Sequence, residues 1–215
     1  MKILLNGKIS ESIFPFYKKY LLLTAAFCLA LLLSPQIEAK QKSPSYALMA
    51  AYTIRNYQEK TPSSERKLLD DSYAITAAYR FPYGFSLGLS HLSHTKKAPD
   101  GTINLQSSGV SLGFIGSRYA SVLYTYLMEP SLRYDFNAIQ SSTSYYGGTG
   151  SMIDVGLHWP VGVDWLQIGP RISLIEVHYK KSKVKNRSEI VENKLDGSPW
   201  RDRWLETYIS LWFLF

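Results

Sequence analysis

The chain has 215 residues, which is enough for one domain or at most two. It contains a single cysteine, Cys28, so a secreted form of the protein cannot be a small fold held together by intramolecular disulfides. Its formal net charge is +7, but nothing in the sequence implies the groove or stacking platform of a nucleic-acid-binding protein, and we expect no nucleic-acid partner.

The N-terminal region has the pattern of a secretory signal peptide. Two lysines precede an uninterrupted apolar run from Tyr20 to Leu33, and a short segment that ends at the small residue Ala39 follows it. The run is shorter than the ~20 residues that a membrane-spanning helix needs, although a single such helix is the alternative. We therefore expect residues 1–39 to be a signal peptide and residues 40–215 to form the mature domain.

From Lys40 onward, apolar residues alternate with small or polar residues at a period of two, which predicts β-strands. In one such segment Ile153, Val155 and Leu157 alternate with Asp154 and Gly156. No long helical pattern interrupts the series. The expected strands lie at about 46–55, 73–81, 85–90, 110–114, 121–128, 153–159, 166–174 and 205–215.

The segments between these strands alternate strictly between short and long. Tight turns are expected at 82–84, 116–118 and 160–164. Short turns at one end and long loops at the other are typical of outer-membrane barrels, and many aromatic residues fall at strand ends, as in interfacial girdles. The sequence thus predicts an all-β fold, an eight-stranded antiparallel up-and-down transmembrane β-barrel. The long polar loops are expected at about 58–71, 96–104, 138–150 and 180–201.

The chain ends in the apolar segment Tyr208-Ile-Ser-Leu-Trp-Phe-Leu-Phe215. A sheet in lipid must close, because unpaired backbone groups are costly in hydrocarbon, so residues 205–215 should pair with about 45–56. Over about residues 45–215 the chain resembles the small eight-stranded outer-membrane barrels of OmpA/OmpX-like architecture. The resemblance implies a monomer in the cell outer membrane, contact with its lipid and lipopolysaccharide, and a barrel-assembly signal, read by the barrel-assembly machinery, at Phe213 and Phe215.

Alternation also places charged side chains inside the expected barrel, where eight strands leave an interior just wide enough for side chains to fill. Buried charges must be paired, so we expect an internal network of ion pairs and hydrogen bonds that closes the interior. A narrow, weakly conducting pore is the alternative. The residues assigned to this polar network are Arg80, Arg133, Arg171, Glu129, Asp154 and Glu206, with Arg55 and Asp135 beside them.

His91 and Ser93 are the only arrangement that suggests catalysis. Both should face the same side of one strand, and the outer-membrane lipid A deacylase family uses a His-x-Ser pair with a carboxylate. That family has a glutamate a dozen residues after the serine, where this chain has Leu105. Without a group to orient the imidazole, polar rim residues are the preferred interpretation, and a lipid-modifying enzyme is the alternative. The four histidines show no metal-ligand spacing, so no metal or cofactor is expected.

The segment from Lys180 to Arg203 is the most charged part of the chain. It holds eight Lys or Arg and four acidic residues, a net charge of +4. A solvated loop explains this composition, and attraction to lipopolysaccharide phosphates is a further possibility for a loop outside the cell. The sequence therefore predicts an integral outer-membrane barrel with a structural or surface-interaction role.

Overall fold

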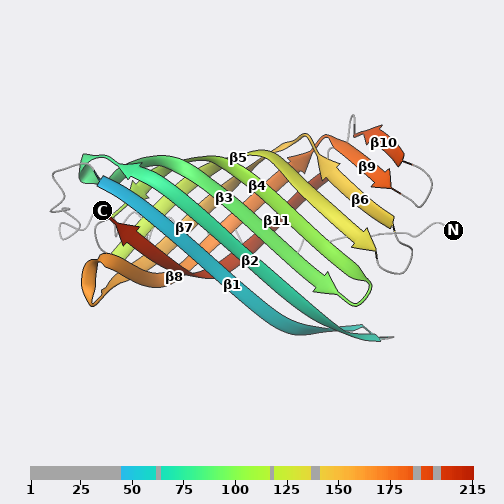
Figure 1. Cartoon of the computed structure of the whole chain (residues 1–215), viewed down its shortest axis with the longest axis horizontal. Coiled ribbons are helices and arrows are strands. Elements are labelled where there is room, and N and C mark those ends of the chain that lie inside the picture. Colours follow the sequence, from blue (N-terminus) through green and yellow to red (C-terminus); the bar gives the residue numbers. More distant parts are fainter. Residues whose placement is uncertain (1–44, 62–63, 117–118, 137–140, 186–189, 196–199) are drawn as a thin grey trace, which may run out of the picture. The chain divides into compact units, whose positions relative to one another are not determined.

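The computed structural model describes residues 45–61, 64–116, 119–136, 141–185, 190–195 and 200–215. The expected signal peptide lies outside these residues. Eight long strands of the described part pair antiparallel with their neighbours and close into a barrel (Figure 1). This confirms the predicted all-β, eight-stranded antiparallel barrel. The strands are β1 (Ser45–Thr61), β2 (Ser64–Arg80), β3 (Phe85–Ala98), β4 (Gly101–Ile115), β5 (Tyr119–Phe136), β7 (Thr149–Val161), β8 (Val163–Tyr179) and β11 (Trp200–Leu214).

The first and last strands close the barrel as predicted, but only over part of their length. Their ladder runs from Ala47 opposite Leu214 to Tyr52 opposite Ile209. Next to it, Tyr46 and Phe215 exchange two backbone hydrogen bonds of 3.0 and 2.9 Å. Beyond this ladder β1 continues to pair with β2, and β11 with β8. Among the described residues, β1 and β11 thus have no backbone pairing in the half of the barrel away from the chain ends.

Tight turns connect strands at the end of the barrel where Ser45 and Phe215 lie, which we call the turn end. A 3-10 turn, η3 (Pro82–Gly84), joins β2 to β3, and Gly84 has a φ of 84°. Gly162, with a φ of 75°, joins β7 to β8. Both values lie in the left-handed region that glycine adopts without a steric penalty. Two of the three predicted tight turns are therefore described, and residues 117–118 of the third lie outside the described residues.

At the opposite end, the loop end, two of the four predicted long loops are wrong. Residues 58–71 are mostly paired strand, because the β1–β2 ladder continues to Thr61 opposite Ser64. Residues 96–104 likewise belong to β3 and β4, which stay paired to Ala98 opposite Gly101. These ladders extend through polar sequence, because the hydrogen bonds of a strand pair join backbone groups and do not require an apolar face.

The other two predicted loops contain short strands that extend the sheet. These are β6 (Ser141–Tyr146), β9 (Lys181–Lys185) and β10 (Ile190–Lys194). β6 pairs with the last part of β5, β9 pairs with β6, and β10 with β9 (Figure 1). We call these three strands the surface sheet.

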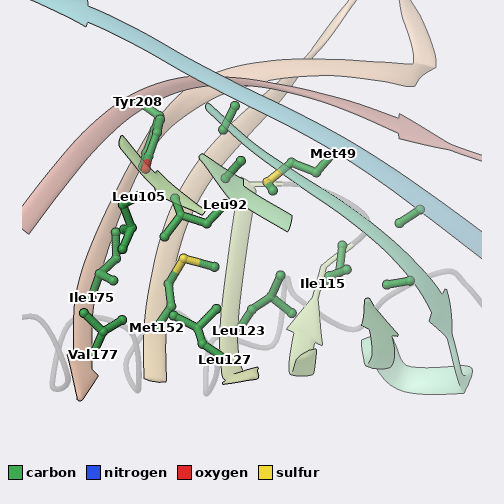
Figure 2. Close-up of a cluster of buried hydrophobic side chains, with 14 of the residues drawn as sticks. Met49, Leu92, Leu105, Ile115, Leu123, Leu127, Met152, Ile175, Val177 and Tyr208 are labelled. Carbon is green, nitrogen blue, oxygen red and sulfur yellow. The ribbon is translucent and has the colours of Figure 1, made fainter. Parts of the chain in front are cut away.

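Side chains that face inward form a mixed core. Many of the buried positions are small or hydroxylic, while a cluster of buried apolar side chains occupies the rest of the interior. Figure 2 shows members of that cluster, which the sequence-based assignment of a polar interior had not anticipated. Those labelled there are Met49, Leu92, Leu105, Ile115, Leu123, Leu127, Met152, Ile175, Val177 and Tyr208. No helix among the described residues is both long and apolar enough to cross a membrane.

Candidate functional site

A buried ion pair between β7 and β8 lies in the middle of the interior. Arg171 donates from Nε to Oδ1 of Asp154 at 3.0 Å, and its Nη2 lies 2.5 Å from Oδ2. Ser173 donates a further hydrogen bond to Asp154, and the Arg171 guanidinium lies 5.7 Å from the centre of the Tyr208 ring. Both charged groups are almost fully buried. The pair is compensated on several sides, as a charge in a low-dielectric interior must be.

A chain of hydroxyl groups crosses four neighbouring strands beside this ion pair. Thr76 and Ser90 hydroxyls lie 2.7 Å apart, Ser90 and Ser111 2.5 Å, and Ser111 and Thr125 2.8 Å. Each hydroxyl can donate one hydrogen bond and accept another, so the three contacts can form in series without intervening water. These contacts fix β2, β3, β4 and β5 to one another through their inward faces.

The interior near the turn end contains another set of buried polar groups. Arg80 donates to the carbonyl oxygen of Ile115 at 3.3 Å and to Ser45 Oγ at 3.5 Å. His158 forms a hydrogen bond with Gln167, and its ring centre lies 5.2 Å from that of Trp212. His158 thus takes part in packing between strands.

A compact group of charged residues lies nearer the loop end, where β1 and β11 no longer pair. Arg55 Nη2 donates to Oδ2 of Asp70 at 3.1 Å and to Oε1 of Glu206 at 2.5 Å. His94 Nδ1 lies 3.4 Å from Asp70 Oδ1 and 3.6 Å from Glu206 Oε2. Glu206 is fully buried and Asp70 nearly so, whereas the Arg55 side chain is 42% exposed. We call Arg55, Asp70, His94 and Glu206 the loop-end cluster.

Within this cluster, three atoms face one another without hydrogen-bond partners among the described residues. They are Asp70 Oδ1, His94 Nδ1 and Glu206 Oε2. The three residues also offer one ligand atom each within 4.8 Å of one another. Arg55 binds the other oxygen of each carboxylate. One nitrogen and two oxygen donors of this kind are ligands that divalent metal ions accept. This is the group of described residues best suited to hold a metal.

Sequence reasoning found part of this cluster. Arg55 and Glu206 stood among the expected inward residues. Asp70 was assigned to a loop, and His94 was set aside for lack of ligand spacing. Extending the alternation along each strand would have found both residues. Asp70 is an even number of residues from the inward Thr76 on β2, and His94 is an even number from the inward Ser90 on β3. Their convergence from β2, β3 and β11 is a property of the closed barrel that spacing along the chain does not show.

Three residues assigned to the interior, Glu129, Arg133 and Asp135, lie outside it. Glu129 and Arg133 are exposed, and Arg133 pairs with Asp135 at 2.9 Å on the surface. The cause is a bulge in β5. Gln106 pairs with Ser131 and Ser108 with Met128, so two residues of β5 stand opposite one of β4. A bulge reverses which alternate residues face inward, and the assignment made by simple alternation fails beyond it.

The candidate catalytic residues His91 and Ser93 both lie on β3. His91 Nδ1 shares a hydrogen bond of 3.0 Å with the hydroxyl of Ser108 on β4, and its ring centre lies 6.0 Å from that of Tyr73. Ser93 is buried, and its backbone carbonyl accepts a hydrogen bond from Ser72. The imidazole is therefore oriented by Ser108, a residue that cannot act as the carboxylate of a catalytic triad.

At the loop end the basic segment is partly neutralised by Glu176 on β8. Arg201 Nη2 lies 2.5 Å from Glu176 Oε1, His178 Nε2 lies 3.0 Å from the same oxygen, and Arg203 Nε lies 3.7 Å from Oε2. In the surface sheet, Lys183 and Glu192 form an exposed ion pair of 2.8 Å, and the hydrogen bond and charge of Lys183 lower the pKa of Glu192. Such exposed pairs contribute little stability.

The two residues of the expected assembly signal differ in their surroundings. Phe213 stacks against Trp165 with ring centres 6.3 Å apart, while Phe215 is exposed at the end of the chain. Comparison of the chain with protein-family models gives no match, and comparison with curated proteins gives none either. The function must therefore be inferred from the residues themselves.

Proposed function

We propose that the protein is an integral β-barrel of the cell outer membrane, with a structural or surface-interaction role rather than a catalytic one. The observation that carries this proposal is a band of exposed apolar side chains on the outward face of all eight long strands. One representative of each strand, in chain order, is Leu48, Ile75, Leu89, Leu112, Tyr126, Ile153, Ile172 and Leu211.

The continuity of this band favours lipid over a protein partner. Soluble monomers rarely expose contiguous apolar patches larger than a few hundred Å², and larger patches mark protein or membrane contacts. A dimer interface would cover one side of a barrel and leave the other strands polar. Here the apolar face runs around the whole circumference, whereas the outer face of a soluble barrel is largely polar.

Aromatic residues at the turn end support the same proposal. Exposed aromatic side chains stand at or near the strand ends there, where an interfacial girdle would lie. The tyrosine and tryptophan rings among them suit the boundary between hydrocarbon and water, because one part of each ring system is apolar and the other polar. They are Tyr46, Phe81, Phe85, Tyr119, Trp159 and Trp165.

The filled interior supports an anchoring role rather than conduction. Large side chains such as Arg171, Tyr179 and Trp212 are fully buried. The surface sheet, with the exposed lysines Lys181 and Lys194, would then be displayed outside the cell. Basic side chains there suit the phosphate groups of lipopolysaccharide.

Bilayer insertion of two variants tests the proposal. Leu211 is exposed on the outward face of β11, and Ser210 is fully buried on the inward face. Leu211→Arg places a charge in lipid at about 2–4 kcal/mol near the midplane, so its folded fraction should fall strongly in bilayers and much less in detergent micelles. Ser210→Arg crowds the interior, so its loss should be similar in both media.

The measurement is the heat-modifiable folded fraction of each variant on gels, after refolding in vesicles and in micelles. If Leu211→Arg folds in bilayers as well as wild type does, the outward band does not face lipid and the proposal is wrong. A soluble, folded wild-type chain in the absence of both detergent and lipid would do so as well.

A further inference from the structure

We propose that Asp70, His94 and Glu206 form a binding site for a divalent metal ion, with Zn²⁺ as the best fit. The inference concerns the loop-end cluster and does not depend on where the barrel resides. Its ligands would be Oδ1 of Asp70 on β2, Nδ1 of His94 on β3 and Oε2 of Glu206 on β11.

The distances between these atoms match those between ligands of one ion. Zn²⁺ binds histidine nitrogen and carboxylate oxygen at about 2.0–2.2 Å, which places two tetrahedral ligands about 3.4 Å apart. The nitrogen of His94 lies 3.4 Å from Asp70 Oδ1 and 3.6 Å from Glu206 Oε2. The three residues offer one ligand atom each within 4.8 Å of one another, so a small movement of one carboxylate completes three of the four positions.

The three atoms are also unsatisfied as hydrogen-bonding groups. Each is buried and has no hydrogen-bond partner among the described residues. Asp70 is 6% exposed and Glu206 is 0% exposed, so solvent does not readily supply that partner. Buried polar atoms are rarely left unsatisfied, and a single cation among them would satisfy all three together.

Arg55 supports this arrangement by holding the carboxylates from the other side. Its guanidinium donates to Oδ2 of Asp70 and Oε1 of Glu206, which leaves Oδ1 and Oε2 turned toward His94. Groups that hydrogen-bond the free oxygen of a ligating carboxylate are a regular part of metal sites. Two carboxyl groups face a single guanidinium here, so the cluster can accommodate a further cation.

The competing interpretation is a protonated His94 that forms ion pairs with both carboxylates. Charge-assisted N–H···O hydrogen bonds are about 2.7–2.9 Å long. The observed separations of 3.4 and 3.6 Å are longer than that, and they agree with the spacing of atoms that share an ion. Geometry therefore favours metal binding over a simple ion pair.

An ion can reach the cluster where the β1–β11 ladder stops. The ladder ends at Tyr52 opposite Ile209, and the partly exposed side chains of Arg55 and His94 lie beyond that point. Asp70 and His94 stand on neighbouring strands, whereas Glu206 stands on β11, on the far side of β1. A bound ion would thus tie β11 to β2 and β3 in the region where backbone pairing between β1 and β11 is missing.

Zinc titration of the refolded chain tests the inference. The tag-free protein is refolded in detergent, stripped with a chelator and titrated with ZnCl₂ by calorimetry. The bound metal is counted by elemental analysis after gel filtration. Wild type should bind one Zn²⁺ per chain. His94→Gln should lose this binding, and Arg55→Gln should weaken it by about 10–100-fold, the usual effect of removing a supporting group.

His91→Gln is the matched control. His91 stands three residues before His94 on the same strand but on the outer face, so this variant should keep wild-type zinc affinity. Glu206→Gln tests the contribution of a carboxylate ligand. Asp70→Asn takes its place in this test if Glu206→Gln does not fold. Co²⁺ provides a second readout, since its visible absorption reports a tetrahedral site, and quenching of Trp204, whose ring centre is 5.9 Å from that of His94, reports proximity.

Absence of binding to folded wild-type protein would overturn the inference. Equal affinity of wild type and His94→Gln would overturn it too, since the ion would then be held elsewhere. An equal loss in His91→Gln and His94→Gln would point to nonspecific histidine binding on the surface and would have the same consequence. All of these results are obtained in detergent, so they are distinguishable from a failure of bilayer insertion.

Discussion

Removing the carboxylate of Asp154 should destabilise the barrel by several kcal/mol. Asp154 is 3% exposed and its partner Arg171 is 1% exposed, so Asp154→Leu leaves a guanidinium in the interior with no counter-charge. Breaking a buried pair in this way costs about 3–5 kcal/mol. A domain with a free energy of unfolding of about 5–15 kcal/mol would lose a large part of its stability.

The structure offers a control of the same chemical type. Arg133 and Asp135 also form an ion pair, but their side chains are 59% and 34% exposed. Exposed pairs contribute about 0–1 kcal/mol, so Asp135→Leu should have little effect. Urea unfolding in lipid vesicles, followed by tryptophan fluorescence and by gel mobility, measures both variants. Equal losses in the two variants would refute the reasoning, because they would mean that Asp154 and Arg171 are as well solvated as the surface pair.

A double variant sharpens the measurement. Asp154→Leu combined with Arg171→Leu removes both charges together, and buried pairs replaced by apolar groups often give neutral or improved stability. The double variant should therefore be more stable than Asp154→Leu alone. Arg171 also contacts the Met49 sulfur and the Tyr208 ring, so recovery should be incomplete.

Two further predictions concern the ends of the barrel and the candidate catalytic residues His91 and Ser93. Trypsin added to intact cells should cut in the surface sheet, for example after the exposed Lys185 or Lys194, and cleavage confined to the turn end near Arg80 would reverse the proposed orientation. His91→Ala and Ser93→Ala should leave the lipid A of expressing cells unchanged in mass relative to wild type; a wild-type mass shift that either variant abolishes would instead establish deacylation.

The strand alternation was sufficient to predict the barrel because it is repeated eight times and because the chain must close. Register between β11 and β1 follows from the apolar face of the last strand, and Leu211 and Ser210 lie on the faces that the sequence assigned. Strand lengths could not be obtained in the same way. Beyond Tyr73 on β2 and Leu89 on β3 the outward residues become polar, so the alternation fades although the backbone ladder goes on.

On β5, alternation gives the inward face correctly only up to the bulge at Glu129. Leu123 and Leu127 face inward as alternation requires, but Leu132 is also buried, an odd number of residues further on. Glu129 has a φ of 46°, which is unusual for a residue with a side chain and marks the place where the parity changes. Nothing in the local sequence other than Pro130, which cannot donate to a ladder, signals such a position.

The mixed interior explains why the loop-end cluster is chemically distinct from the other charged groups. His94 shares its inward face with Leu92, and Glu206 shares its face with Tyr208, and both of these neighbours are buried in the apolar core. Charges interact more strongly beside apolar groups than in water, and an unpaired one is more costly there. Arg171 and Asp154 avoid this cost because they pair with each other. Asp70 and Glu206 share one guanidinium, and each still turns an oxygen without a hydrogen-bond partner toward His94. The apolar surroundings make repulsion between the two carboxylates costly. The same surroundings would make a divalent cation an effective partner for both.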